Sequence, residues 1–194
     1  NVNLLATIEK EGCKVIPSSK TLEVIQNKYI QKSMLRKMGV KIPEFSKVNS
    51  LDDLKKEFEC LGQQAILKSC TNGYDGKGNY MIKNEDDLEK AYQLLGEQEV
   101  FVEELIDFIM EVSIVVVKNN SGISFYPVAE NEHHDSILIK SLIPASLPDE
   151  VINKIHAVSE KIIEEFDDFG IYCIEFFIDN DYEVLVNEIA PRPR

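Results

Sequence analysis

Apolar residues recur at steps of three and four positions between Thr21 and Gly39, a spacing typical of one amphipathic helix. The apolar positions are Leu22, Ile25, Tyr29, Ile30, Met34 and Met38. Gly39 and Pro43 mark its expected end, because glycine is favoured just after a helix and proline cannot continue one. We therefore predict a single helix over residues 21–39.

Two shorter helices are predicted on either side of a pair of strands. Ser50 with Asp53, and Asn84 with Asp87, have the spacing of helix N-caps. The apolar positions that follow are Leu51, Leu54, Phe58 and Leu61 in the first helix and Leu88, Ala91, Tyr92 and Leu95 in the second. Between the helices, residues 65–68 and 79–83 read as short strands joined by a glycine-rich loop. This order predicts a small lobe over residues 45–105.

The pattern changes near residue 99 to longer β-rich segments. The predicted strands cover residues 99–103, 110–118, 123–128 and 137–142, with a hairpin turn at Asn119-Asn120-Ser121-Gly122. The remaining elements are a helix from Pro148 through Phe166 and a hairpin of residues 171–178 and 182–189 turned at 179–181. Helices and mostly antiparallel strands in separate groups indicate an α+β fold with two lobes.

The composition excludes some classes of binding partner. The 194 residues include 34 acidic and 21 basic side chains, a formal net charge of −13, so the field of the chain repels nucleic acid. No apolar run reaches the 18 residues of a membrane-spanning helix. The four cysteines form no C-x-x-C pair, which favours a reducing compartment. We predict a soluble cytoplasmic protein without nucleic-acid or membrane partners.

The segment Gly73-Tyr74-Asp75-Gly76-Lys77-Gly78-Asn79 joins the two strands of the small lobe. Its glycines allow positive φ and leave backbone N–H groups open to an anion, and its lysine adds positive charge. It lacks the G-x-x-x-x-G-K-[ST] pattern and leads into a strand, so it is not a P-loop. It is either a flap over phosphates or a tight hairpin with an exposed lysine. Lys68, at the end of an apolar strand, favours the flap, although such a lysine can also simply extend into solvent.

Three carboxylates lie within apolar strands: Glu111, Glu175 and Glu188. Burying a carboxylate is costly unless it is paired or holds a metal, and oxygen ligands suit Mg²⁺, so the three suggest a cation site. A turn centred on Asn180 places Glu175 opposite Leu185, three residues short of Glu188. Solvated glutamates at strand edges are the alternative.

His133 and His134 follow Glu130-Asn131-Glu132, a polar stretch that interrupts strand-like sequence. Because no third imidazole or thiolate stands at usable spacing, zinc is not expected. One of these histidines could instead hydrogen-bond a phosphate, and His156 is read as ordinary helix surface.

Several motifs, taken in chain order, resemble those of the ATP-grasp ligases. They are Asn27-Lys28, Ile66-Leu67-Lys68, the 73–79 loop, Glu111-Val112-Ser113, Tyr126-Pro127-Val128-Ala129-Glu130-Asn131-Glu132-His133 and Asn187-Glu188-Ile189-Ala190-Pro191-Arg192. Within that family the resemblance is greatest to the branch that carboxylates an aminoimidazole ribonucleotide in purine biosynthesis. It implies ATP clasped between a small lobe and a larger α+β lobe.

The resemblance also implies a role for individual residues. ATP contacts would come from Lys28, Lys68, the loop residues Gly73, Tyr74, Asp75, Gly76, Lys77, Gly78 and Asn79, the adenine linker Glu103, Glu104, Leu105 and Ile106, and Glu111, His133, Asn187 and Glu188. Glu175 and Glu188 would bind Mg²⁺, and Glu111 would accept hydrogen bonds from the ribose. Arg192, with Asn187 beside the metal, would serve the group derived from bicarbonate.

The implied reaction is ATP- and bicarbonate-dependent carboxylation of 5-aminoimidazole ribonucleotide through carboxyphosphate, in a homodimeric full-length enzyme. The expected parts are a remnant of an N-terminal domain (1–20), a helical connection (21–44), the small lobe with its flap (45–105) and the large lobe with the metal site (106–194). Both ends are expected to be cut, since the family has further domains before and after this region. The alternatives are another ATP-grasp carboxylate–amine ligase and a non-catalytic nucleotide-binding fragment.

Overall fold

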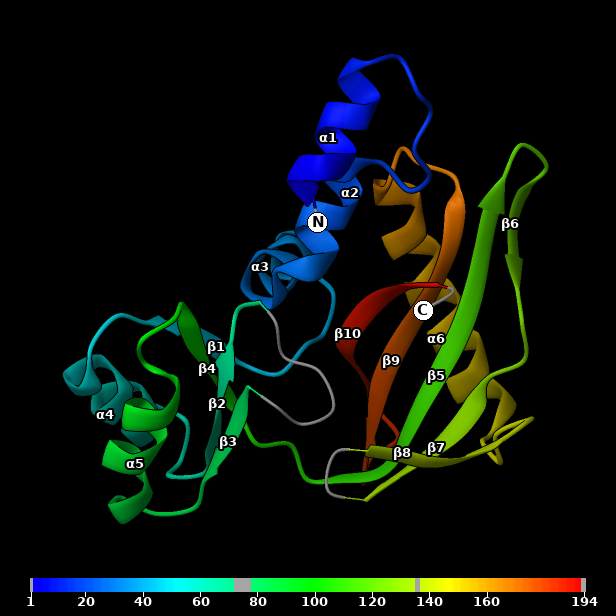
Figure 1. The fold of residues 1–194 in the computed structure, drawn as a ribbon. Coiled ribbons are helices and arrows are strands. Elements are labelled where there is room, and N and C mark those ends of the chain that lie inside the picture. Colours follow the sequence, from blue (N-terminus) through cyan, green and yellow to red (C-terminus); the bar gives the residue numbers. More distant parts are fainter. Residues whose placement is uncertain (1, 72–77, 135–136, 193–194) are drawn as a thin grey trace.

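The computed structural model describes residues 2–71, 78–134 and 137–192 and arranges them around two antiparallel sheets (Figure 1). The helices are α1 Val2–Lys10, α2 Ser19–Gln26, α3 Lys28–Lys37, α4 Leu51–Cys60, α5 Asp86–Leu95 and α6 Asp149–Glu165. The strands are β1 Phe45–Val48, β2 Ala65–Ser69, β3 Asn79–Ile82, β4 Val100–Glu104, β5 Phe108–Asn119, β6 Gly122–Phe125, β7 Ala129–His134, β8 Ile137–Leu142, β9 Gly170–Asp179 and β10 Val184–Arg192. The predicted α+β class is confirmed.

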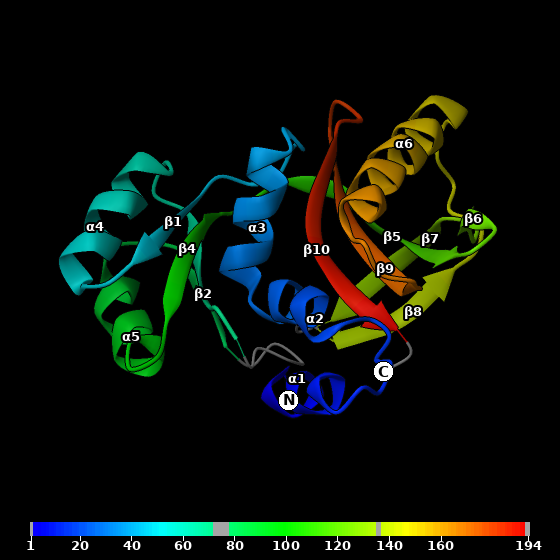
Figure 2. The same ribbon diagram turned by 90° about the horizontal axis from the view of Figure 1, so that it is seen from above.

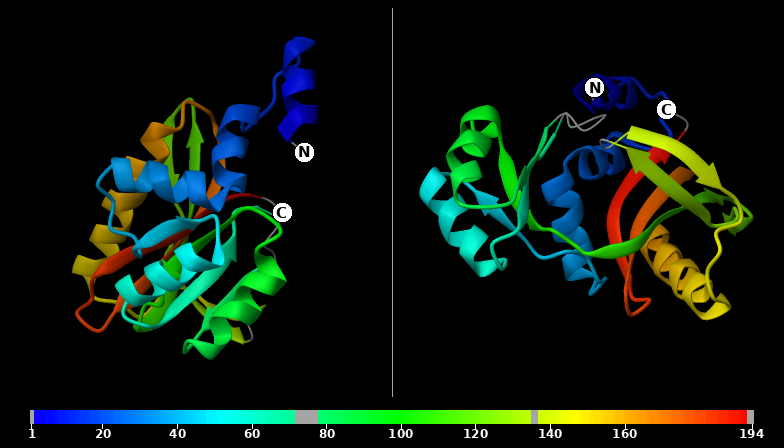
Figure 3. Two further views of the ribbon diagram at one scale, coloured as in Figure 1. Left: turned by 90° about the vertical axis from the view of Figure 1, so that its left-hand side faces the viewer. Right: turned by 90° about the horizontal axis from the view of Figure 1, so that it is seen from below.

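The smaller sheet has the strand order β1-β4-β2-β3, and α4 and α5 lie on one of its faces (Figure 3). Helix α4 begins as predicted, because the side chain of Ser50 accepts a hydrogen bond from the backbone N–H of Asp53 at 3.0 Å. The apolar core between the helices and this sheet includes Leu54, Phe58, Leu67, Ile82, Leu88, Ala91 and Val102. The helices therefore leave the other face of the sheet open to the rest of the chain.

The larger sheet has the order β10-β9-β5-β7-β8, with β6 paired to the far end of β5. Alternate residues of its long strands are buried beneath α6, as the period of a strand requires. The core there includes Val112, Ile114, Val116, Ile155, Ile162, Tyr172, Ile174 and Phe176. The opposite face of this sheet turns toward α3 and the smaller sheet (Figure 2).

The predicted single helix over 21–39 is wrong, because Asn27 divides it into α2 and α3. Asn27 has an extended backbone, with φ −101° and ψ 102°, and its side chain accepts a hydrogen bond from the backbone N–H of Ile30 at 3.1 Å. The backbone N–H of Lys28 donates outside the helix, to the carbonyl of Cys70 at 2.8 Å. The apolar spacing runs through this break unchanged, so periodicity alone could not reveal it.

Two strands are additions to the predicted set. β1 was not predicted, and the polar stretch at residues 130–134 was expected to interrupt strand structure but forms most of β7. Its polar side chains find partners on neighbouring strands: the amide of Asn131 donates to the hydroxyl of Ser113 and accepts from Ser141, each at 2.8 Å. Such cross-strand hydrogen bonds compensate for the missing apolar residues.

In the described ranges, no helix combines the length and apolar character that crossing a membrane demands.

Candidate functional site

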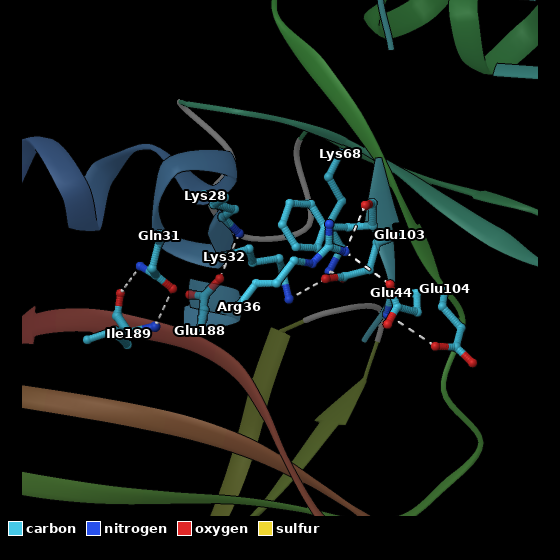
Figure 4. A network of polar contacts seen from close by, with 11 residues as sticks. Lys28, Gln31, Lys32, Arg36, Glu44, Lys68, Glu103, Glu104, Glu188 and Ile189 are labelled. Carbon is cyan, nitrogen blue, oxygen red and sulfur yellow. Dashed lines mark hydrogen bonds and ion pairs between the residues drawn. The ribbon is translucent and has the colours of Figure 1, made fainter. Parts of the chain in front are cut away.

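Helix α3 brings a basic residue against a carboxylate of the larger sheet (Figure 4). The ammonium group of Lys28, in the first turn of α3, lies 2.7 Å from a carboxylate oxygen of Glu188 on β10. The two side chains are 21% and 23% exposed, so both can be reached by a ligand. Lys28 and Glu188, predicted from motifs 160 positions apart, are thus brought together by the fold.

A buried group of three charges lies beside this pair. One carboxylate oxygen of Glu103 on β4 forms an ion pair with Lys32 of α3, and the other forms one with Lys68 of β2. Lys32 and Glu103 are 3% and 1% exposed, whereas Lys68 is 10% exposed. With both lysines protonated, this group carries two positive charges and one negative charge, a net charge of +1. An anion near Lys68 would therefore meet a positive centre that solvent scarcely screens.

Burial opposes the charges of Glu103 and Lys32, and their ion pairs act against that effect. Burial alone would raise the pKa of Glu103, but the ammonium groups of Lys68 and Lys32 hold it below its ordinary value. Burial lowers the pKa of Lys32, and the attraction of Glu103 works against that shift. A single buried carboxylate thus stays ionised because two lysines share it.

The two predicted metal ligands face each other across the hairpin of β9 and β10. Val186 pairs with Phe176, and after an irregularity at Asn187 the next pair joins Glu188 to Glu175. The predicted register, with Glu175 opposite Leu185, is wrong. The turn is centred one residue later than expected, and the bulge at Asn187 adds one further residue to β10.

The electrostatics of Glu175 show what surrounds it. Burial and the adjacent carboxylate of Glu188 raise the pKa of Glu175 from its ordinary 4.5 to about 6. His133, Arg192 and Lys28 act in the opposite direction. Residues predicted from three separate motifs therefore lie close enough to influence one carboxyl group.

Glu111 and His133 form a second part of the site. Glu111 of β5 makes a close contact with the imidazole of His133 on β7. Among the described residues, Glu111 does not join Glu175 and Glu188 in a cluster of three metal-ligating side chains. Both residues line a pocket of about 320 Å³ whose walls come from the beginning of β5 and from β7 and β8. Phe108, Asn131 and Lys140 complete much of its lining. The pocket thus offers apolar surface, charge and hydrogen-bonding groups to one ligand.

The other predicted residues lie around these groups. Glu104 ends β4 and accepts a hydrogen bond from the backbone N–H of Glu44 at 3.2 Å, and the partly buried Leu105 and Ile106 connect β4 to β5. Gly78 has φ 90°, and Asn79 begins β3 opposite Lys68. Arg192, at the end of β10, hydrogen-bonds the thiol of Cys173, and its charge helps offset the burial that raises the pKa of that thiol. Gly73, Tyr74, Asp75, Gly76 and Lys77 lie outside the described residues.

The sequence of the chain matches a known domain family. The ATP-grasp domain profile matches residues 33–194, most of the chain. The chain belongs to the ATP-grasp family. The two antiparallel sheets and the charged groups facing each other across α3 are thus those of an ATP-grasp domain.

Two relatives of this ATP-grasp chain are enzymes of one kind, carboxyaminoimidazole ribonucleotide synthases. The N5-carboxyaminoimidazole ribonucleotide synthase of Bacillus subtilis (strain 168) is 37% identical over 185 residues, which are 95% of this chain and 49% of that protein. The carboxyaminoimidazole ribonucleotide synthase of Aspergillus clavatus complexed with ATP superposes with a TM-score of 0.95 at 32% identity, over all of this chain and 51% of the other. A structure of the Aspergillus clavatus enzyme with ADP and 5-aminoimidazole ribonucleotide gives 0.92 at 30% identity, with 100% and 51% coverage. The chain spans about half the length of these relatives.

The carboxylate pair of this ATP-grasp domain fits a divalent cation. Within residues 2–71, 78–134 and 137–192, no three His, Cys, Asp or Glu side chains converge as metal ligands. Two facing carboxylates, one of which retains a proton to about pH 6, are nevertheless suited to a cation that takes the place of that proton. Mg²⁺ with only two protein ligands typically completes its coordination with phosphate oxygens and water.

The sequence motifs did not single out Gln31 and Lys32, although both are buried in the ATP-grasp site. Lys32 follows Lys28 by four residues, so the two share one face of α3. That spacing was the available signal. The spacing alone did not indicate a buried lysine, because a polar residue on a helix is usually solvated and the partner of Lys32, Glu103, lies on a strand distant in the sequence.

Proposed function

We propose that this chain is the ATP-binding part of an enzyme that carboxylates 5-aminoimidazole ribonucleotide with ATP and bicarbonate. The observation that carries the proposal is the group of facing charges. The Glu175–Glu188 pair lies within reach of Lys28, beside a buried trio with a net positive charge. Polyphosphate with a bound cation is the ligand that such an arrangement suits. The relatives crystallised with ATP, or with ADP and 5-aminoimidazole ribonucleotide, supply the substrate class.

The nucleotide would lie between the two sheets. Lys28 and Lys68 would bind its phosphates, with the loop at residues 73–79 over them. The backbone of residues 103–106 would meet the adenine, and Glu111 and His133 in the 320 Å³ pocket would hydrogen-bond the ribose and neighbouring atoms. Support for this placement comes from the apolar and polar lining of the pocket and from His133, which lines it and is close enough to Glu175 to lower the pKa of that carboxyl group.

Glu175 and Glu188 would hold Mg²⁺, with Asn187 beside them. When bound, the cation would neutralise developing charge on the transferred phosphoryl group. Bicarbonate would attack the γ-phosphate, releasing ADP and forming carboxyphosphate. The amine of the ribonucleotide would then attack the carboxyl carbon, and phosphate would leave. Arg192 would orient the bicarbonate-derived group, and this chain would contribute positioning and exclusion of water.

Nucleotide binding is the direct test of the site. Isothermal titration of the 194-residue chain with Mg²⁺ and a non-hydrolysable ATP analogue should give binding that Lys68→Ala and Glu188→Gln each weaken by about tenfold or more. Lys83→Ala, a change of an exposed lysine just after β3, is the matched control and should bind as the unaltered chain does. Unchanged affinity in both site variants would contradict the assignment.

Turnover tests the reaction. A full-length protein that contains this chain should release ADP only when bicarbonate and 5-aminoimidazole ribonucleotide are both present. Turnover that depends on a different amine would indicate another ATP-grasp ligase, and nucleotide binding without turnover would indicate a non-catalytic role. A homodimer and a cytoplasmic location are part of the same proposal, and light scattering and cell fractionation of that protein test them.

A further inference from the structure

One helix touches both halves of the proposed site. Three residues of α3, Lys28, Gln31 and Lys32, are spaced so that they lie along one face of the helix. Lys28 and Gln31 reach the larger sheet, and Lys32 reaches the smaller one (Figure 4). The position of α3 therefore fixes charges of the two sheets relative to each other.

Gln31 anchors α3 to β10. Its amide nitrogen donates to the carbonyl of Ile189 at 2.9 Å, and its amide oxygen accepts from the backbone N–H of Ile189 at 2.8 Å. The same nitrogen also donates to the carbonyl of Ile25 at 3.1 Å, and the side chain is 1% exposed. A buried amide with both ends paired is costly to move, because any shift leaves a polar group unsatisfied. The helix is thus held next to Glu188.

Lys32 meets the smaller sheet but cannot meet a ligand. Its side chain is 3% exposed and points at one oxygen of Glu103, whose other oxygen is bonded to Lys68. Of the two lysines, Lys68 is the one with access to solvent. Without Lys32, both oxygens of Glu103 would be free for Lys68, and the net charge of the group would fall from +1 to zero.

We propose that Lys32 is a positioning residue for the phosphates of ATP, because by pairing with Glu103 it leaves Lys68 able to bind a phosphate. Gln31 fixes the helix that carries Lys32 next to Glu188. Lys32 acts through Glu103 and does not touch the nucleotide. The inference rests on the proposed function, because it assumes that Lys68 binds phosphate.

Three variants test the role of the charge. Lys32→Met keeps the length of the side chain without its charge, and Lys32→Arg keeps the charge. Lys37→Met makes the same change at an exposed position of α3 and is the matched control. Calorimetry should measure the dissociation constants of a non-hydrolysable ATP analogue with Mg²⁺ and of adenosine, after circular dichroism has established that each variant is folded. Should Lys32→Met fail to fold, Lys32→Gln replaces it, since its amide can still donate to Glu103.

We expect Lys32→Met to bind the ATP analogue about tenfold or more weakly, with the adenosine constant unchanged within about twofold. Lys32→Arg should restore most of the affinity, and Lys37→Met should have none of the effect. A purely structural role would lower the thermal midpoint but leave the dissociation constant of the folded protein unchanged. Equal affinity of folded Lys32→Met and the unaltered chain would overturn the inference.

A double substitution tests the route through Lys68. If Lys32 acts through that residue, Lys32→Met combined with Lys68→Met should bind no more weakly than Lys68→Met alone. Losses that multiply would show an independent action of Lys32 and would overturn the inference. If the unaltered chain binds the ATP analogue no better than adenosine, the proposed function itself fails. If the unaltered chain binds it well and Lys32→Met matches it, only the inference fails.

Discussion

The facing carboxylates of β9 and β10 should cost stability, and replacing Glu175 by glutamine measures that cost. Burial and Glu188 raise the pKa of Glu175 from 4.5 to about 6 in the folded chain. A difference of roughly 1.5 units corresponds to about 2 kcal/mol, because each unit is about 1.4 kcal/mol. Glu175→Gln removes the charge and keeps the shape, so it should raise the free energy of unfolding at pH 8 by up to about 2 kcal/mol. The thermal midpoint should rise by up to roughly 4–8 °C.

The pH dependence has a definite sign. Because the folded pKa of Glu175 lies above the unfolded value, the folded chain binds more protons between about pH 4.5 and pH 6. The unaltered chain therefore loses stability as pH rises through that window, whereas Glu175→Gln lacks this contribution. The difference between the two should be small below about pH 4.5 and constant above about pH 6.

Urea unfolding at a series of pH values, with Glu164→Gln as the control, provides the assay. Glu164 is an exposed residue of α6, so its substitution should leave the pH profile unchanged. Adding Mg²⁺ with an ATP analogue should stabilise the unaltered chain far more than Glu175→Gln, since the carboxylate that repels Glu188 is also the proposed metal ligand. A Glu175→Gln variant that is no more stable than the unaltered chain at pH 8 would refute this reasoning.

Three further substitutions probe the framework by thermal or urea unfolding. Ser50→Ala removes the cap that accepts from the N–H of Asp53 and should cost about 1 kcal/mol; an unchanged midpoint would contradict the assigned cap. Tyr172→Phe should be neutral or stabilising by up to about 1 kcal/mol, because that buried hydroxyl has no hydrogen-bond partner among the described residues; a clear loss of stability would count against this. Asp168→Ala should cost about 1–3 kcal/mol of stability, since Asp168 accepts hydrogen bonds from Ser18 and Thr21. These hydrogen bonds hold the pKa of Asp168 below 3.8 despite burial, so the loss of stability should shrink as pH falls below about 3.8. A loss that does not depend on pH would contradict that cause.

Local signals predicted local structure well. The serine cap of α4, the helix after Pro148 and the final hairpin all follow from side chains a few residues apart. Asn27 shows the limit, because it ends one helix and caps the next without disturbing the apolar spacing. A cap of this kind is visible in the sequence only when its hydrogen-bond partners are considered together with the pattern.

The register of the β9–β10 hairpin and the burial of Lys32 could not be predicted from neighbouring residues in the sequence. The pairing of Glu175 with Glu188 depends on the turn geometry and on a bulge at Asn187, and alternation of side chains fixes neither. The burial of Lys32 depends on Glu103, which is 71 positions away in the chain. Motif resemblance predicts roles for Glu188 and Lys68, whereas the burial of Lys32 against Glu103 follows only from the assembled sheets.

The hydrogen bonds between Gln31 and Ile189 have a consequence for the order of folding. They join positions 158 residues apart, so α3 is synthesised well before β10 and finds this anchor only when β10 has been made. Until then the buried amide of Gln31 and the ammonium group of Lys28 lack their partners on β10, and the smaller sheet can form first around its own core. Truncation within β10 should thus leave a folded small lobe with α3 still paired to Glu103 through Lys32 but no longer anchored to the larger sheet through Gln31.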